Sequence, residues 1–271
     1  SVVIPNSTLS IDQSAFYGCN NLLKVIIGNS VKNIENGAFY NCSSLREVII
    51  PDSVKNIGSE AFYGCSSLRK VSIGNSVEHI GSGTFYGCSS LREVIIPDSV
   101  KNIERKAFYG CSSLRKVSIG NSAEDIDKEA FYGCKSLSNI EVNDFNKSYC
   151  SIDGVLFNKD TTALIMCPGG KTSYIIPDSV KVIKEYAFYG CSSLRKVIIG
   201  NSVKDIEKDA FCYCSSLKEV IIGNSVEDID KEAFYGCKSL SNIEVNYFNK
   251  SYCSIDGVLF NKDTTALIMC P

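Results

Sequence analysis

The 271-residue chain has no tryptophan, only two methionines and no excess of charge of either sign. Lys and Arg number 28 against 30 Asp and Glu, so the net charge is −2 and no net field attracts nucleic acid or an anionic membrane. No apolar run approaches the roughly 18 to 20 residues that cross a bilayer. The sequence therefore predicts no nucleic-acid binding and no membrane insertion.

Histidine is almost absent too, and this limits the catalytic chemistry that the chain can support. Any Ser-His-Asp or Cys-His site would have to use His79, the single histidine. Its position in the chain is held by Asn33, Asn56 and Asn102 in neighbouring segments, which predicts a surface side chain. No Gly-rich phosphate loop follows a strand pattern. We therefore expect no catalytic residue, no cofactor, no metal site and no enzymatic activity.

What the chain does have is a repeat. The motif Ala-Phe-Tyr-Gly-Cys, or a close variant, recurs every 23 residues, except for one step of 57 between Phe131 and Phe188. Self-similarity at a fixed period is the signature of a repeat architecture. The motif phenylalanines are Phe16, Phe39, Phe62, Phe85, Phe108, Phe131, Phe188, Phe211 and Phe234.

Each repeat also contains a strand pattern that ends in a turn signal. In segment 45–50, Val48 and Ile50 have the period of two that sends them to one face, whereas Glu47 and Ile49 point the other way. The Pro or Gly, Asx and Ser that follow favour a turn out of the strand.

The motif itself predicts a short helical turn. Ala61 and Phe62 would form it, and Gly64 would end it with a positive φ. Asn41 suits the same position, whereas Tyr213 does not.

A single coil cannot fold alone. Burying its apolar groups contributes on the order of 10 to 20 kcal/mol, whereas ordering its backbone costs about 1 to 2 kcal/mol per residue. The coils must therefore stack in register. We predict a mostly β, right-handed α/β solenoid of 23-residue coils with a parallel sheet along one side.

A second repeat divides the chain into blocks. Residues 135–168 recur as residues 238–271 and differ only at Asp144, where the second copy has Tyr247. Strand patterns on both sides of residues 158–162 predict a β-hairpin. The chain starts in a strand pattern and stops after a hairpin without a recognisable cap, so we expect it to be part of a longer array. The expected blocks are coils in 1–142 and 169–245, and hairpins in 143–168 and 246–271.

Coils of the form Leu-x-x-Val-x-Ile-Pro-x-Ser-Val-x-x-Ile-x-x-x-Ala-Phe-x-x-Cys resemble the BspA-like class of leucine-rich repeats, and the hairpin around 152–157 resembles the one found between coils of that class. The resemblance implies a secreted or surface protein of a host-associated bacterium or parasitic protist, with a role in adhesion. It carries over no binding residue, because the class shares a scaffold and varies its partners. Asp52 lies one residue earlier than the usual Asn of leucine-rich repeats, so the standard Asn ladder is not assumed.

Nine of the fourteen cysteines occupy one coil position. Stacking would place them about 4.7 to 4.9 Å apart and pointing the same way, which suits free buried thiols better than disulfides. Cys150 and Cys167 lie on opposite arms of the hairpin and could pair, as could Cys253 and Cys270, so both pairings stay open. The nine are Cys19, Cys42, Cys65, Cys88, Cys111, Cys134, Cys191, Cys214 and Cys237.

The outward face of the strands is the candidate binding surface. Isoleucine fills most of its positions, and Glu and Lys alternate in the column beside it. Exposed apolar rows mark contact surfaces, although β-branched residues also favour strands without any binding role. The candidate residues are Ile26, Glu47, Ile49, Lys70, Ser72, Glu93, Ile95, Lys116, Ile198 and Ile221.

We therefore expect an extracellular or cell-surface module that binds a protein or glycan, such as one of host origin, through this face. The alternative is a structural array whose repeats associate with copies of themselves and take no external ligand.

Overall fold

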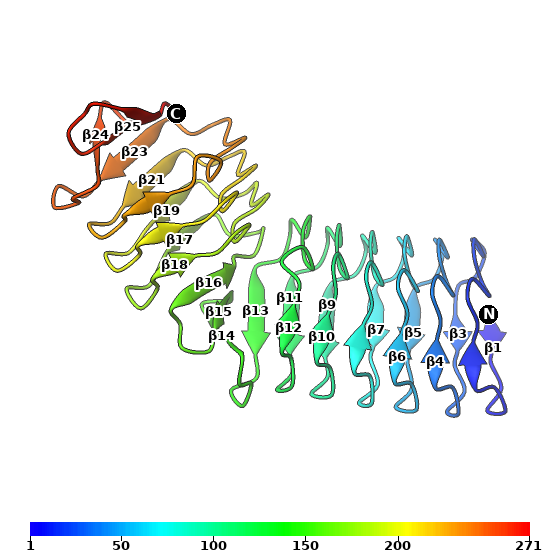
Figure 1. The fold of residues 1–271 in the computed structure, drawn as a ribbon. Helices are drawn as coiled ribbons and strands as arrows, with labels where there is room; N and C mark the ends of the chain where they lie inside the picture. The colour runs from blue at the N-terminus through cyan, green and yellow to red at the C-terminus, as the bar shows by residue number, and fades with distance from the viewer. The chain divides into compact units, whose positions relative to one another are not determined.

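The computed structural model describes residues 1–271 and consists of strands and turns, without a helix. Successive 23-residue coils stack into a β-solenoid (Figure 1). Two compact units make up the chain, residues 1–151 and residues 152–271. The stacked coils and their mostly β character confirm the predicted solenoid, and its right-handedness stays a prediction.

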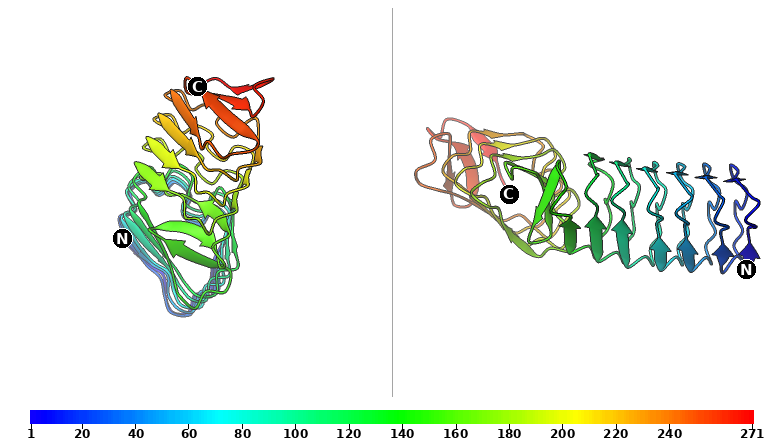
Figure 2. Two further views of the ribbon diagram at one scale, coloured as in Figure 1. Left: turned by 90° about the vertical axis from the view of Figure 1, so that its left-hand side faces the viewer. Right: turned by 90° about the horizontal axis from the view of Figure 1, so that it is seen from below.

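In residues 1–151 one strand of each coil contributes to a parallel row, here called the main row, which Figure 2 shows as a single file of coils. The strands of this row form three separate parallel sheets, and within each sheet they pair with a step of 23 residues, so that Glu93 faces Lys116 and Val94 faces Val117. This register confirms the predicted stacking. The strands are β1 (Val2–Val3), β3 (Val25–Ile26), β5 (Glu47–Ile49), β7 (Lys70–Ser72), β9 (Glu93–Ile96), β11 (Lys116–Ile119) and β13 (Asn139–Val142).

A second parallel row runs along the same unit and is built from two-residue strands. His79 lies here, half-buried and paired in register with Asn56 and Asn102, as expected of a surface position. The strands are β2 (Ser10–Ile11), β4 (Asn33–Ile34), β6 (Asn56–Ile57), β8 (His79–Ile80), β10 (Asn102–Ile103) and β12 (Asp125–Ile126).

Residues 152–271 repeat this plan. The main row holds β17 (Ser173–Ile175), β19 (Lys196–Ile198), β21 (Glu219–Ile222) and β23 (Asn242–Val245). The second row holds β16 (Ala163–Met166), β18 (Val182–Ile183), β20 (Asp205–Ile206) and β22 (Asp228–Ile229).

The hairpins form as predicted. β15 (Val155–Asn158) pairs antiparallel with β16, and β16 then pairs parallel with β18, so the hairpin supplies a strand of the second row. The second copy forms the antiparallel sheet β24 (Tyr252–Ile255), β25 (Val258–Asn261) and β26 (Leu267–Met269). β14 (Tyr149–Ile152) precedes the first hairpin and contains the division between the two compact units.

The core is a column of phenylalanine rings. In residues 1–151 the centroids of neighbouring rings lie 4.9 to 5.4 Å apart and the rings are close to parallel. In residues 152–271 the spacings are 4.5 and 4.9 Å. Rings such as Phe85 and Phe211 have no exposed surface. Each coil thus buries its largest side chain against the coils on either side.

The corner that carries the motif is not helical, and the predicted helical turn at Ala61 is wrong. The N–H groups of Ala61, Tyr63 and Cys65 donate locally, each to the carbonyl three residues earlier. The alternating groups of Phe62 and Gly64 donate instead to carbonyls of the next coil. A helix would need all five of these donors for itself, and two of them hold the stack together.

The positive φ expected at the end of the motif is present. Gly64 has a φ of 69° and Asn41 one of 54°. Tyr213 adopts 58° at the same position, although its side chain disfavours that region. The coil geometry therefore overrides the local preference of the residue.

Candidate binding surface

The outward side chains of the main row are exposed in residues 1–151. Because strand side chains alternate, Val48 and Val94 point into the core while Ile49 and Ile95 project outward. Ile49 is 60% exposed and Ile95 64%, and Ile26 is exposed as well. Ser72 is half-buried between two of these positions. The structure thus brings the predicted isoleucines onto one face.

The predicted charged column lies on the same face. Glu47 faces Lys70 in register, with 3.4 Å between Nζ and Oε1. Lys116 faces Glu93 and forms an ion pair of 2.8 Å with Glu141. The charges on this face therefore occur largely as pairs between neighbouring coils.

Pairing changes the protonation behaviour of these groups. The hydrogen bond from Lys116 lowers the pKa of Glu141 below its usual value, and the same bond raises the pKa of Lys116. Such exposed pairs contribute little to stability, because solvent screens the charges. These ion pairs matter more for the pattern of charge on the outward face than for the stability of the fold.

A groove runs across the carboxyl ends of the first main-row strands. It encloses about 850 Å³ and is lined by Ile26, Ile49 and Ser72 together with the turns that follow the strands. A second hollow of about 460 Å³ lies beside Ile95 and Lys70. Both open on the outward face, so the exposed isoleucines border concave surface.

The turns that line the groove are cross-linked by an Asx ladder. The N–H of Asn75 donates to the Asp52 side chain at 2.7 Å, and the N–H of Asn121 donates to Asp98 at the same distance. The position of the usual Asn is held by Ser53, whose hydroxyl donates to the carbonyl of Val31 at 2.7 Å, so this position and the one before it both bond to the neighbouring coil. The bond between Asn75 and Asp52 lies in the lining of the groove.

Residues 152–271 carry a groove of their own on the main row. It encloses about 540 Å³ and is lined by Ile175, Ile198, Ile221 and Glu244. Ile198 and Ile221 are half-buried, whereas Ile175 is 67% exposed. The two predicted residues of this unit thus lie together, and Ile175 belongs with them.

The cysteine column is a buried ladder of free thiols. None of the fourteen cysteines forms a disulfide, including Cys150 and Cys167 on the hairpin. Seven of the nine column thiols are buried. Cys88 donates to the carbonyl of Phe62 at 3.3 Å, and other members make the equivalent bond.

Burial raises the pKa of the Cys42 and Cys65 thiols. The pKa of Cys42 is raised to about 11, and that of Cys65 is raised further by deeper burial. A thiol in this state is neutral at physiological pH and unsuited to nucleophilic chemistry. The column acts as part of the core.

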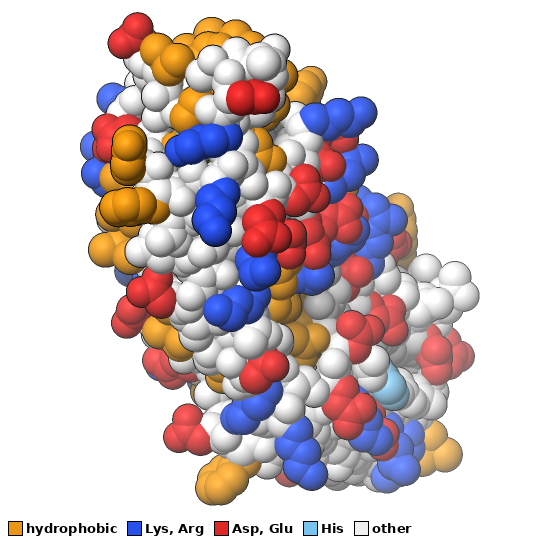
Figure 3. All heavy atoms as spheres, turned by 60° about the vertical axis from the view of Figure 1, so that its left-hand side comes forward, with side chains coloured by type: hydrophobic (Ala, Val, Ile, Leu, Met, Phe, Trp, Pro, Cys, Tyr) orange, Lys and Arg blue, Asp and Glu red, His pale blue; other side chains and the backbone are white.

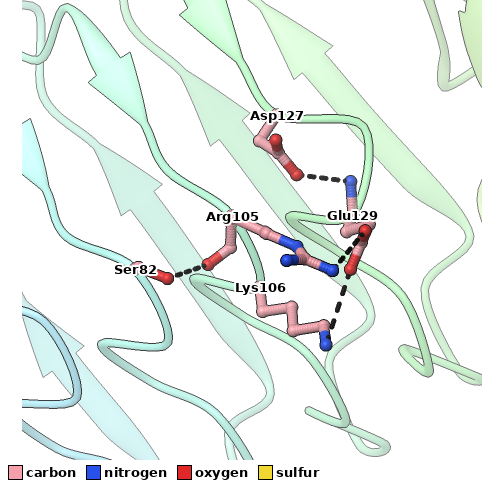
Figure 4. Close-up of polar contacts among 5 residues, drawn as sticks. All are labelled: Ser82, Arg105, Lys106, Asp127 and Glu129. Carbon is pink, nitrogen blue, oxygen red and sulfur yellow. Dashed lines mark hydrogen bonds and ion pairs between the residues drawn. The ribbon is translucent and has the colours of Figure 1, made fainter.

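Charged residues of the segments that follow the second row interact between coils. Glu129 accepts an ion pair from Arg105 at 3.0 Å and one from Lys106 at 3.7 Å (Figure 4). The Asp127 carboxylate accepts the N–H of Glu129 at 2.8 Å, and Ser82 donates to the carbonyl of Arg105. These carboxylates are therefore occupied by turns and ion pairs. Figure 3 shows a face on which acidic side chains gather with Lys and Arg beside them.

The structure contains no group of three or more His, Cys, Asp or Glu side chains arranged to hold a metal ion. No segment forms a helix with the length and hydrophobicity that a bilayer crossing requires.

The repeat and its geometry identify the class of protein. The family model for the BspA type leucine-rich repeat region matches residues 1–112, 78–169 and 167–267, in six copies. The chain therefore belongs to the BspA-type leucine-rich repeat family, as its coil motif indicated.

Solved structures of bacterial proteins share the fold. A leucine-rich repeat protein from Eubacterium ventriosum is 25% identical, with a TM-score of 0.69 over 82% of this chain and 60% of its own. A leucine-rich cell surface protein from Faecalibacterium prausnitzii is 28% identical, with a TM-score of 0.54 over 90% of this chain and 87% of its own.

The pneumococcal vaccine antigen PcpA is 25% identical, with a TM-score of 0.59 over 93% of this chain and 63% of its own. The chain thus spans less than two thirds of the length of two of these three proteins. Comparison with curated protein sequences finds no match.

Proposed function

We propose that the chain is a non-catalytic binding module of an extracellular or cell-surface protein, and that it engages a protein or glycan partner through the outward face of its main row. The observation that carries the proposal is the groove of about 850 Å³ bordered by Ile26 and Ile49. Concave surface with exposed apolar residues and a few fixed polar groups is where proteins bind ligands.

The groove offers both apolar surface and hydrogen-bonding groups to a partner. Ile49 and Ile95 offer apolar surface, and burying either side chain contributes about 1.5 to 3 kcal/mol. The Asx turns and paired charges at the rim supply hydrogen-bonding groups held in place by the stack. Related folds occur in a bacterial cell surface protein and in a vaccine antigen, which supports a surface location.

The double variant Ile49→Lys/Ile95→Lys tests the proposal. We expect it to lose at least about tenfold in affinity for a partner found in a panel of purified extracellular matrix proteins and glycans, because it places charge in the apolar contact. Surface plasmon resonance with the immobilised partner measures the loss. The matched control, Asn56→Lys/Asn102→Lys, adds the same charge on the second row of neighbouring coils and should bind normally.

Equal binding by both variants, or no binding to any member of the panel by the unaltered chain, would contradict the proposal. Concentration-dependent assembly in light scattering that Ile49→Lys/Ile95→Lys abolishes would identify the partner as a second copy of this chain.

A further inference from the structure

The corner next to the core phenylalanines carries a column of tyrosines, and this column differs between the two units. In residues 1–151 each ring stacks on the next, with centroids 4.5 to 4.9 Å apart and planes within 9° of parallel. Rings at this spacing leave no room between their faces. The stacked residues are Tyr17, Tyr40, Tyr63, Tyr86 and Tyr109.

In residues 152–271 one coil carries different residues at two neighbouring positions of the motif. Cys212 stands where the adjacent coils have Tyr189 and Tyr235, and Tyr213 stands where they have glycine. Two coil steps separate Tyr189 from Tyr235, which is about 9.5 Å at the usual strand spacing. These two rings therefore cannot stack, and the buried Cys212 is too small to fill the gap.

The ring of Tyr213 lies beside the space between Tyr189 and Tyr235 and contacts both rings. It lies 5.6 Å from Tyr189 and 5.6 Å from Tyr235, at angles of 87° and 78°. Tyr186 makes a similar edge contact with Tyr189, at 5.4 Å and 67°. Rings that meet edge to face leave parts of their faces open, and they line an open hollow of about 300 Å³.

Gly236 is needed to seat Tyr213 in this arrangement. A Cβ atom on Gly236 would lie 2.6 Å from Cδ1 of the Tyr213 ring. The equivalent Gly190 has no neighbour within 4 Å of such an atom. The pocket therefore depends on a specific contact between two coils.

The pocket is acidic. Asp209 and Glu232 line it together with the tyrosines. One cation, Lys208, pairs with Glu232 at 3.2 Å and is largely exposed, so two carboxylates face one ammonium group. Burial, with Asp209 nearby, raises the pKa of Cys212 to about 12, so the thiol adds no charge.

The first unit shows that this corner accommodates a cation. Lys106 places its Nζ 5.7 Å from the centroid of Tyr109. In residues 152–271 the positions that correspond to Lys106 are Tyr186, Asp209 and Glu232, none of which is basic. The second unit thus has more open aromatic surface and no counterpart of Lys106, and Lys208 is the cation that pairs with its Glu232.

We propose that Tyr186, Tyr189, Tyr213, Tyr235, Asp209 and Glu232, here called the tyrosine cage, bind an alkylammonium group, either quaternary or that of a lysine side chain. Aromatic faces attract such a cation through their quadrupole, and carboxylates attract it by charge. The cage is separate from the main-row face, so the inference does not depend on the proposed function.

Nuclear magnetic resonance titration with small ions tests the cage directly. The probes are tetramethylammonium, n-butylammonium and the uncharged 3,3-dimethylbutan-1-ol. We expect saturable shifts of the cage tyrosine resonances with the ammonium ions and none with the alcohol. Tighter binding of tetramethylammonium would indicate a quaternary amine, and tighter binding of n-butylammonium a lysine side chain. Absence of saturation by both ions up to about 100 mM would overturn the proposal.

The double variant Cys212→Tyr/Tyr213→Gly restores the sequence of the other coils and should let the rings stack. We expect it to fold and to weaken ammonium binding at least about tenfold, because the gap is filled. Asp209→Asn, which keeps the rings, should weaken binding about fivefold. Tyr63→Phe, in the stacked column, is the control and should leave binding unchanged. Equal binding by the double variant and the unaltered chain would show that the cage is not the site.

Discussion

In residues 1–151 every coil has a tyrosine after the core phenylalanine and the rings form a stacked column, whereas in residues 152–271 the same column is interrupted at Cys212. The phenylalanine column behind it is unchanged, with ring spacings of 4.9 to 5.4 Å in one unit and 4.5 to 4.9 Å in the other. Fully buried rings have no space for a different partner, while a half-exposed column can exchange residues and acquire a pocket. The buried columns define the scaffold, and the half-exposed column is where the units differ.

If the phenylalanine columns of the two units are equivalent, truncating one ring should lower the free energy of unfolding by the same amount in either unit. Phe85→Ala and Phe211→Ala each remove a ring with no exposed surface, and we expect each to lower the free energy of unfolding by about 3 to 5 kcal/mol. Urea denaturation followed by circular dichroism measures the loss. A difference between the two variants of more than about 2 kcal/mol would break the equivalence.

The column of buried thiols offers a second test of whether the two units are equivalent. The quantity to compare is the pH dependence of the free energy of unfolding. The pKa of Cys88 and that of Cys214 are raised by burial above the ordinary value of 9.0. The folded chain therefore keeps these protons while the unfolded chain begins to lose them near pH 9, so their contribution is complete below pH 9 and declines as the pH rises further.

Cys88→Ser and Cys214→Ser should each make the decline above pH 9 less steep, by up to about 1.4 kcal/mol per pH unit. The free energy of unfolding measured in urea between pH 7 and pH 10.5 gives the slope, about four points being sufficient. Cys19→Ser alters an exposed thiol and serves as the control. An unchanged slope in both buried variants would contradict the role of burial.

The smallest expected effect separates two coils within residues 152–271. Gly190→Ala and Gly236→Ala both place a side chain at a positive φ, of 66° and 75°, which costs about 1 kcal/mol. Gly236→Ala must in addition displace Tyr213, and we expect it to cost about 1 kcal/mol more. The excess should vanish when each change is made in a Tyr213→Ala background. Persistence of the excess there would mean that Tyr213 is not its cause.

Much of this fold follows from the period of the sequence. A motif that returns every 23 residues places Phe39 over Phe62 and Glu47 beside Lys70 in any in-register stack, so the columns could be predicted without coordinates. The outward position of Ile49 followed in the same way from strand alternation.

The details that escaped prediction depend on contacts between coils. The motif looks helical on its own, but Phe62 gives its N–H to the next coil. Asn146 lies in an Asn-x-Ser triplet that resembles a surface acceptor, yet it is buried and donates to the carbonyls of Gly120 and Ala123. The exchange at Cys212 was visible in the sequence, but the orientation of the Tyr213 ring was not.

The alternation of Glu47 and Lys70 sets a repeat distance along the main row. Since the sign of the charge changes at each coil, an identical environment returns only at every second coil, about 9.5 Å along the stack. A polymer whose own units advance by that distance would meet the same pattern at each step, and one with another pitch would drift out of phase. The charges of the main row therefore repeat at every second coil, whereas its strands repeat at every coil.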